Sequence, residues 1–248
     1  MSVDQTSRQD PGFISLTAGT AHRTDPLFAR ELVTLGHGLR AEGDAHNLLQ
    51  RALDGALRCI TAATCAGVAV SDHGHLTSEA HTDDVAGHLH RVQFAVQGGP
   101  CVDAAQQPEP VLADDLRREQ RWPEFAARAV ERGMRAVLSV QLFVDANVLG
   151  AVSFYADEPG RFSADDERVA LLLASQMSMA LAALRARGNF EIALSSRDVI
   201  GQAKGILMER FKISAQEAFE ILVAVSQRRH IKLRNVADQL TRTGDLDI

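Results

Sequence analysis

The C-terminal stretch from Val199 to Leu240 constrains the fold more than any other part of this chain. It contains three short segments whose apolar residues recur every three or four positions, the spacing that places side chains on one face of a helix. The second segment opens at Ser214, whose hydroxyl and the Glu217 carboxylate can cap the free amides of a first helical turn. Because such short helices cannot bury their apolar faces alone, the sequence predicts a three-helix unit that ends near Gly244. The expected core positions are Ile200, Ala203, Leu207, Phe211, Phe219, Leu233, Val236, Ala237 and Leu240.

Positive charge gathers at this end of an otherwise acidic chain. From Arg185 to the C-terminus, eleven Lys and Arg residues stand against eight Asp and Glu residues, whereas the whole chain has a formal net charge of −6. A positive potential confined to one end gives a phosphate backbone one preferred docking surface. The alternative is that these residues form ordinary solvated helix faces. The charge distribution therefore favours a protein that binds nucleic acid over a protein that catalyses a reaction.

The residues of this stretch also resemble a known family. The matching positions are Arg197, the run from Ile200 to Met208, Ala218-Phe219, Ser226-Gln227, Lys232-Leu233-Arg234 and Val236-Ala237. Together they are similar to the ANTAR domain, the RNA-binding module of transcription antitermination regulators. The resemblance implies a dimer that binds paired RNA stem-loops with six-nucleotide loops. Two positions depart from the usual pattern and bear on loop preference: His230 stands where Asn is frequent, and Asn235 where Asp is common.

Recognition of an RNA loop requires donors that reach unstacked base edges and cations that hold the backbone, because the deep groove of A-form RNA hides its bases. Lys204, which lies between Gly201 and Gly205, fits the first requirement, and the basic residues near positions 228 to 234 fit the second. Aromatic residues make up only 5% of the chain, so base stacking should contribute little. The candidate RNA-binding residues are Arg197, Gln202, Lys204, Gly205, Arg210, Ser226, Arg228, Arg229, Lys232 and Arg234.

Length and composition indicate two domains. The chain has 248 residues, of which 46% are hydrophobic and 23% charged, enough for one sizeable core and a second small one. The sequence analysis finds no run of apolar residues long enough to span a bilayer and no hydrophobic signal region in the first twenty residues, so a cytoplasmic location without membrane contact is expected. Three scattered cysteines fit neither a disulfide framework nor a zinc site, so reduced thiols are expected.

The part before the C-terminal stretch predicts a mixture of helices and hairpins. Residues 1–25 are polar and indicate a flexible arm, and a helix is plausible from Pro26. A first hairpin is predicted around the turn at residues 72–75, and a second joins the apolar runs 136–144 and 148–155. Strands and amphipathic helices without strict alternation indicate an α+β fold, with an antiparallel sheet covered by helices.

This part also resembles a known family. The matching positions are Gly99-Pro-Cys101, Asp115-Leu116, Arg121-Trp-Pro123, Phe125, Gly133, Leu149-Gly-Ala151, Phe154-Tyr155 and Phe162. They are similar to a GAF domain of the subtype that precedes ANTAR in actinobacterial regulators, over about residues 45 to 185. The resemblance implies a sensory domain with a possible small-molecule ligand, whose identity stays unknown. In this subtype Gly-Glu often precedes Gly-Pro-Cys, whereas this chain has Gln97-Gly98, so the loop lacks a carboxylate for any cationic ligand.

A helix should connect the two domains. It is predicted to start after Phe162, where Ser163 and acidic residues suit a helix N-terminus. Its first half is expected to pack on the sheet and its second half to form a parallel coiled coil with a partner chain, with Gly188 as an interruption. The predicted organisation is an arm (1–25), a GAF-like sensor (26–180), a coiled-coil helix (181–198) and an ANTAR domain (199–248).

Catalytic and metal-binding alternatives rest on the cysteines and histidines. Enzymes that reduce free methionine sulfoxide use cysteines on a GAF-like fold, and this chain has Cys59, Cys65 and Cys101. Cys59 is expected to be a buried apolar thiol, whereas Cys101 beside a Gly-Pro turn is expected to be exposed and is a candidate redox sensor. The histidine pairs, His73 with His75 and His88 with His90, lack a spacing that completes a metal site.

The sequence therefore predicts a regulator and not an enzyme: an RNA-binding antiterminator, controlled by a GAF-like sensor. The alternative is a ligand-responsive or redox-responsive interaction module whose helical tail binds DNA or joins subunits. Preference for stem-loop RNA over duplex DNA separates the two.

Overall fold

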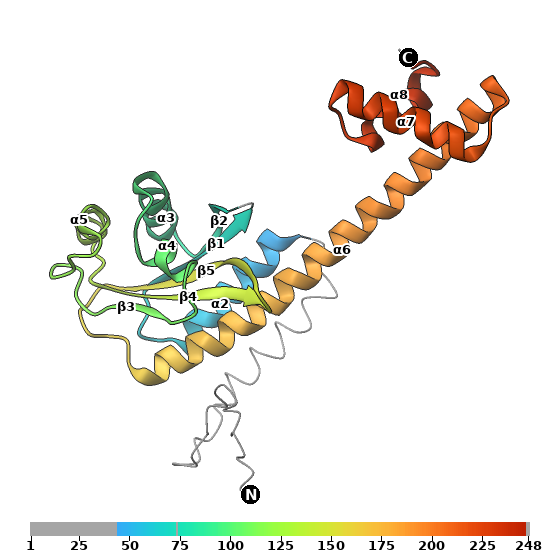
Figure 1. Ribbon diagram of the computed structural model, residues 1–248. Coiled ribbons are helices and arrows are strands. Elements are labelled where there is room, and N and C mark those ends of the chain that lie inside the picture. The colour runs from blue at the N-terminus through green and yellow to red at the C-terminus, as the bar shows by residue number, and fades with distance from the viewer. Residues whose placement is uncertain (1–43, 73, 247–248) are drawn as a thin grey trace, which may run out of the picture.

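A computed structural model describes residues 44–72 and 74–246, which form a sheet-containing domain and a small helical unit joined by one long helix (Figure 1). This helix, α6 (Ala164–Phe211), has 48 residues. It runs along the sheet, leaves the domain and ends in the helical unit (Figure 1). The expected arm (1–25) and the helix expected from Pro26 lie outside the described residues.

The sheet is antiparallel throughout, which confirms the α+β prediction. Within the described residues its five strands lie in the order β2-β1-β5-β4-β3, and each neighbouring pair is antiparallel. The strands are β1 (Cys65–Asp72), β2 (His75–His81), β3 (Val111–Ala113), β4 (Ala136–Val144) and β5 (Asn147–Ala156).

Both predicted hairpins are present. In the first, Asp72 pairs with His75 at the end of β1 and β2. In the second, Val144 pairs with Asn147, and Asp145 adopts a φ of 53°, the left-handed conformation that short hairpin turns require. A register shift between Leu142 and Phe143 marks a bulge in β4 close to this turn. At this bulge the backbone amide of Phe143 bonds to Ser178 of helix α6.

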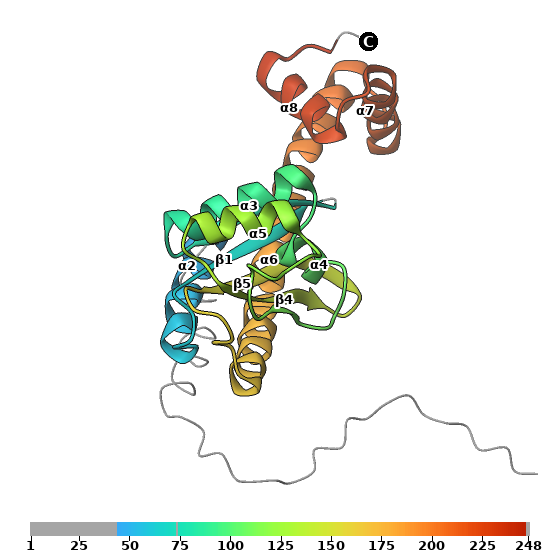
Figure 2. The same cartoon turned by 90° about the vertical axis from the view of Figure 1, so that its left-hand side faces the viewer.

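Helices cover both faces of the sheet and create two apolar cores (Figure 2). One face packs against α2 (Ala45–Cys59) and the first half of α6, and the other against α3 (Asp84–Val96), α4 (Pro100–Ala104) and α5 (Pro123–Glu131). The alternation of side chains along the strands produces this division, since Val68 and Val70 face α2 and α6 whereas Cys65 and Ala69 face the other helices.

Helix α6 starts where the sequence predicted but continues further. The Ser163 hydroxyl accepts from the Asp166 amide and the Asp166 carboxylate accepts from the Ser163 amide, which forms the capping box of its first turn. The expected interruption at Gly188 is wrong, because the helix passes through it without a break. A glycine costs about 1 kcal/mol relative to alanine inside a helix, which a long run of favourable neighbours outweighs. The first of the three predicted short helices is therefore the last part of α6.

The C-terminal unit consists of the end of α6, α7 (Ala215–Arg229) and α8 (Leu233–Thr243). The predicted capping box at Ser214 is present, and Gly244 caps α8 with a φ of 69°. Phe211 was expected in the core, but it is not a core residue. Its side chain is 47% exposed, because α6 ends there and the chain turns at Lys212. The buried core consists of Ala203, Leu207, Ala218, Leu222, Val225, Val236, Ala237, Leu240 and Leu246.

Candidate nucleic-acid interface and sensory pocket

Two cations on α6 share a hollow with the first turns of α7. Arg197 and Lys204 line it together with Phe219, and Gly201 lies between them on the same helix face. The Lys204 ammonium lies 5.8 Å from the centre of the Phe219 ring, within the range of a cation–π contact. Phe219 was expected in the core, but it is only half-buried, and its ring lies beside Lys204 at the surface.

A second hollow adjoins the first and adds two further cations. It lies where α6 meets the turn between α7 and α8, and Lys232 and Arg234 line it. Ser196 of α6 borders both hollows, which makes the two cation pairs neighbours on one surface. We call this surface the basic face and define it by Arg197, Lys204, Lys232 and Arg234.

Three of the sequence-predicted RNA-binding residues lie elsewhere. Gln202, Gly205 and Arg210 line a separate hollow between the end of α6 and α8, together with Glu209 and Thr241. The Arg210 guanidinium donates a hydrogen bond to the carbonyl of Gly244, which ties α6 to the end of α8. Arg210 thus has a structural contact within the three-helix unit.

The remaining candidates lie at the end of α7. The Ser226 hydroxyl donates to the carbonyl of Ile231 at 2.6 Å and so closes the turn into α8. The Arg229 guanidinium donates to the Gln239 side chain of α8 at 3.1 Å, and Arg228 is exposed. None of these three lines the hollows of the basic face.

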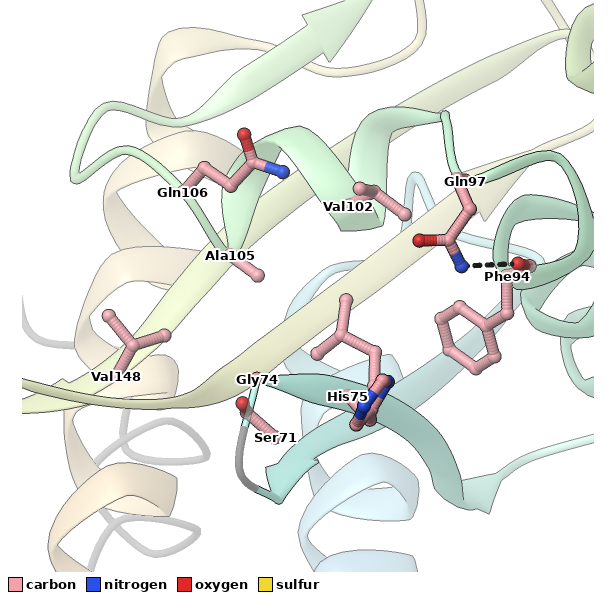
Figure 3. A pocket seen from close by; sticks show the side chains of 10 residues that line it. Ser71, Gly74, His75, Phe94, Gln97, Val102, Ala105, Gln106 and Val148 are labelled. Carbon is pink, nitrogen blue, oxygen red and sulfur yellow. Dashed lines mark hydrogen bonds between the residues drawn. The ribbon is translucent and has the colours of Figure 1, made fainter.

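The sensor domain has a hollow of about 340 Å³ at the ends of its two hairpins, which we call the hairpin hollow (Figure 3). Its polar lining comes from Ser71, His75, Gln97 and Gln106, and its apolar lining from Leu76, Phe94, Val102, Ala105 and Val148. The loop that carries Gln97 therefore edges a pocket. Sequence reasoning singled out this loop but not the other lining residues, because they come from five elements whose proximity is set by the tertiary fold.

Cys101 was expected to be exposed, but it is buried. It belongs to α4, its side chain is fully buried, and its amide donates to the Gln93 side chain at 2.7 Å. Burial raises the pKa of the Cys101 thiol to about 12, and burial also raises the pKa of Cys65. Because the thiolate is the reactive form, neither thiol is activated for redox chemistry. Cys59, expected to be buried, is only partly so.

His90 is a buried titratable group of the sensor domain. It is fully buried on α3, where its Nδ1 lies 3.0 Å from the Ser78 hydroxyl, and its Nε2 has no hydrogen-bond partner among the residues that the structure describes. Burial, aided by the nearby His81, lowers its pKa to about 3. Within residues 44–72 and 74–246, no group of three His, Cys, Asp or Glu side chains is arranged to hold a metal ion.

The buried His90 predicts a loss of stability in mild acid. The pKa of this group is lower in the folded state than its usual 6.5, so the unfolded chain takes up the proton first as the pH falls. We expect the free energy of unfolding to decrease from about pH 6.5 downwards, by up to about 1.4 kcal/mol per pH unit from this group. Urea titrations followed by the fluorescence of Trp122, the one tryptophan, measure this loss.

A His90→Gln variant is the matched control, since an amide can still bond to Ser78 but does not titrate. The difference between the two proteins should shrink as the pH falls from 6.5 to 4. A constant difference would contradict the assignment of the pKa shift to His90.

The fold and these two sites describe a sensory domain joined by a helix to a small, basic three-helix unit. The chain belongs to the GAF domain family, whose model matches residues 42–182, and the ANTAR domain model matches residues 189–240. GAF domains are sensory modules, and ANTAR is an RNA-binding antitermination domain. Both resemblances predicted from the sequence are therefore confirmed.

Solved structures support the GAF fold. A GAF domain of a phosphoenolpyruvate-protein phosphotransferase from Coxiella burnetii has a TM-score of 0.52 at 17% identity, over 65% of this chain and 96% of that one. The free methionine-R-sulfoxide reductase of Neisseria meningitidis, in complex with its substrate, has a TM-score of 0.52 at 15% identity, over 68% and 96%. A phytochrome photosensory core module from Stigmatella aurantiaca has a TM-score of 0.55 at 12% identity, over 84% and 46%. No curated protein sequence matches the chain.

In the described part of the chain, one helix meets the length and hydropathy expected of a membrane span. This helix is α6, and 39% of its most apolar 18-residue window is buried within the protein. Leu173, Met177 and Leu181 of α6 pack in the core beneath the sheet. A core helix of this kind passes the same test as a membrane span, so the result is weak support for a membrane location.

Proposed function

We propose that this protein is a cytoplasmic, homodimeric antitermination regulator. In this proposal each ANTAR domain binds one of two adjacent RNA stem-loops with six-nucleotide loops, and the GAF domain adjusts binding in response to a signal. The observation that carries the proposal is the basic face, where Arg197, Lys204, Lys232 and Arg234 surround Ser196. Stabilised stem-loops would prevent formation of a terminator hairpin.

The basic face has the chemistry that a stem-loop requires. Arg197, Lys232 and Arg234 are exposed and can neutralise phosphates, whereas Lys204 is half-buried and held over a ring. A cation whose position is fixed in this way suits contact with a base edge in an unstacked loop. The open helix surface at Gly201 lets a loop backbone approach closely, since a Cβ there would meet nothing within 4 Å.

The middle of α6 supports the dimer. Where the helix leaves the sheet, apolar residues continue at intervals of three and four, and their side chains are exposed: Met179 is 59% exposed and Phe190 is 69% exposed. The stripe consists of Met179, Ala183, Ala186, Phe190 and Leu194. Such spacing fits a two-stranded coiled coil, which would cover the stripe and hold two basic faces together. The second stem-loop would then bind at a raised effective concentration.

A regulatory role fits the sensor domain better than catalysis. Two of the three thiols, Cys65 and Cys101, are buried, and burial raises the pKa of both. The hairpin hollow offers hydroxyl and amide groups and a histidine, without an arrangement of nucleophile and base. We therefore assign the domain to sensing.

Fluorescence anisotropy against an RNA with two adjacent six-nucleotide-loop hairpins tests the proposal. We expect the native loops to bind at least tenfold more tightly than the same stems with scrambled loops, because base contacts are worth about 1–3 kcal/mol each. A single hairpin should bind more weakly than the pair. Equal affinity for scrambled loops and for duplex DNA would overturn the proposal and favour a DNA-binding or subunit-joining tail.

A further inference from the structure

The hairpin hollow has the size and lining of a small-molecule site. Its volume of about 340 Å³ lies at the lower end of the range for ligand pockets. The Phe94 side chain borders one side, and the Gln97 amide lies above it (Figure 3). The Gln97 nitrogen donates to the Phe94 carbonyl at 2.8 Å, which fixes the amide so that its oxygen faces the hollow.

The charges of the lining restrict the ligand. Among the described lining residues there is no Asp, Glu, Lys or Arg, and His75 is the single ionisable side chain. A charged ligand would lose its hydration in the hollow without gaining a counter-ion. This loss should weaken its binding several-fold or more. Hydroxyl and amide groups at Ser71, Gln97 and Gln106 can bond to neutral donors and acceptors. The lining therefore selects against phosphates, carboxylates and ammonium groups.

A hydrogen bond connects the first hairpin to α6. Ser71, which lines the hollow, lies at the end of β1, and its carbonyl accepts from the Arg185 guanidinium at 3.0 Å. Arg185 lies on α6 between the part that packs on the sheet and the part that runs to the basic face. The β1–β2 hairpin is thus bonded directly to this helix.

A second hydrogen bond connects the other hairpin to the same helix. Val148, which also lines the hollow, pairs with Phe143 at the bulge of β4. The Phe143 amide donates to the Ser178 hydroxyl at 3.0 Å, and that hydroxyl donates to the Ala174 carbonyl of α6 at 2.7 Å. Both hairpins that border the hollow are therefore anchored to α6.

We propose that the hairpin hollow binds a small, uncharged aromatic amide or a molecule of the same chemistry, and that Arg185 and Ser178 transmit its binding to α6. The ligand class follows from the lining alone. The transmission to RNA rests on the proposed function, because α6 carries half of the basic face.

Matched sets of small molecules test the ligand class on the full chain. Benzamide, benzoate and benzamidine have one shape and differ in charge, as do nicotinamide and nicotinate. Saturation-transfer NMR should show binding of the amides at millimolar concentration, at least about tenfold more tightly than the acids or the amidine. Binding should be lost in Ala105→Trp, which fills the hollow, and in Val148→Trp, which obstructs it from an exposed strand end.

Either variant suffices if the other does not fold. Preference for a charged member, binding retained in the folded variant, or no binding of either amide overturns the ligand class. This measurement needs no RNA, so its outcome is independent of the proposed RNA function.

Transmission is tested by RNA affinity with and without the amide that binds. We expect the amide to change the affinity of the wild-type protein by severalfold and to leave that of Arg185→Gln unchanged. Arg187→Gln is the matched control, because Arg187 pairs with Glu191 on the same helix at 3.1 Å and is well exposed. An equal response of the two variants would overturn the role of Arg185.

Discussion

Replacement of Gly150 by alanine should unfold the sensor domain, with a loss of more than about 4 kcal/mol in the free energy of unfolding. Gly150 lies on β5 with a φ of 147°, a conformation that residues with a side chain rarely adopt. A Cβ there would lie 1.9 Å from the carbonyl oxygen of Ala69 on β1, and 2.9 Å from the Cα of Val70. Both contacts are with backbone in the middle of the sheet, so no side chain can move to relieve them. Chemical denaturation followed by Trp122 fluorescence measures the effect.

Gly133→Ala separates the clash from the backbone strain. Gly133 also has a positive φ, of 84°, but a Cβ there would meet nothing within 4 Å. This variant should lose only about 1–2 kcal/mol, the cost of a left-handed conformation for an L-residue. Similar losses in the two variants would mean that the β1–β5 contact can adjust, and the expected unfolding would be wrong.

The strands and helix starts were predictable because their signals are local. The second hairpin follows from two apolar runs around a short polar turn, and the helix starts follow from Ser163 and Ser214 with an acidic residue three positions later. Each signal lies within a few residues of the element that it specifies. Such patterns determine structure before any tertiary contact forms.

The length of α6 and the burial of Cys101 were not predictable in this way. Gly188 is an unfavourable helix residue. Only the whole run from Ala164 to Phe211 shows that the helix propensity of its neighbours outweighs the cost of this glycine. Cys101 follows a Gly-Pro turn that usually marks a surface, but the Gln93 side chain and Tyr155 cover it from α3 and β5. Both outcomes depend on contacts between residues far apart in sequence.

The candidate interface was predicted in composition but not in arrangement. The sequence identified the basic residues, and their charge does gather in one unit. It could not separate the basic face from Arg210, because the contact of Arg210 with Gly244 forms only when α8 folds back onto α6. The hollows around Ser196 likewise depend on how the α7–α8 turn meets α6. Of the ten candidate RNA-binding residues, the structure places four, Arg197, Lys204, Lys232 and Arg234, around Ser196, and these four define the proposed RNA surface.

Removal of two cations from the basic face should strongly weaken RNA binding. In the double variant Arg197→Gln with Arg234→Gln, each change deletes one exposed guanidinium beside Ser196. The dependence of log affinity on log salt should fall by about 1 for each lost phosphate contact. At 0.1 M salt this corresponds to roughly 100-fold weaker binding for the pair. Anisotropy titrations with the two-hairpin RNA at several salt concentrations measure both quantities.

A second double variant with the same change in net charge decides whether the position of the removed cations determines RNA affinity. Arg187→Gln with Arg242→Gln removes two cations that lie outside the basic face, where each forms a surface ion pair, with Glu191 and Asp238 respectively. These pairs are exposed and contribute at most about 1 kcal/mol to stability, so the fold should persist. If long-range attraction alone governed binding, both double variants would lose affinity equally. We expect the control to keep nearly wild-type affinity and salt dependence, because contact with phosphate requires a cation at the docking surface and not merely on the same domain.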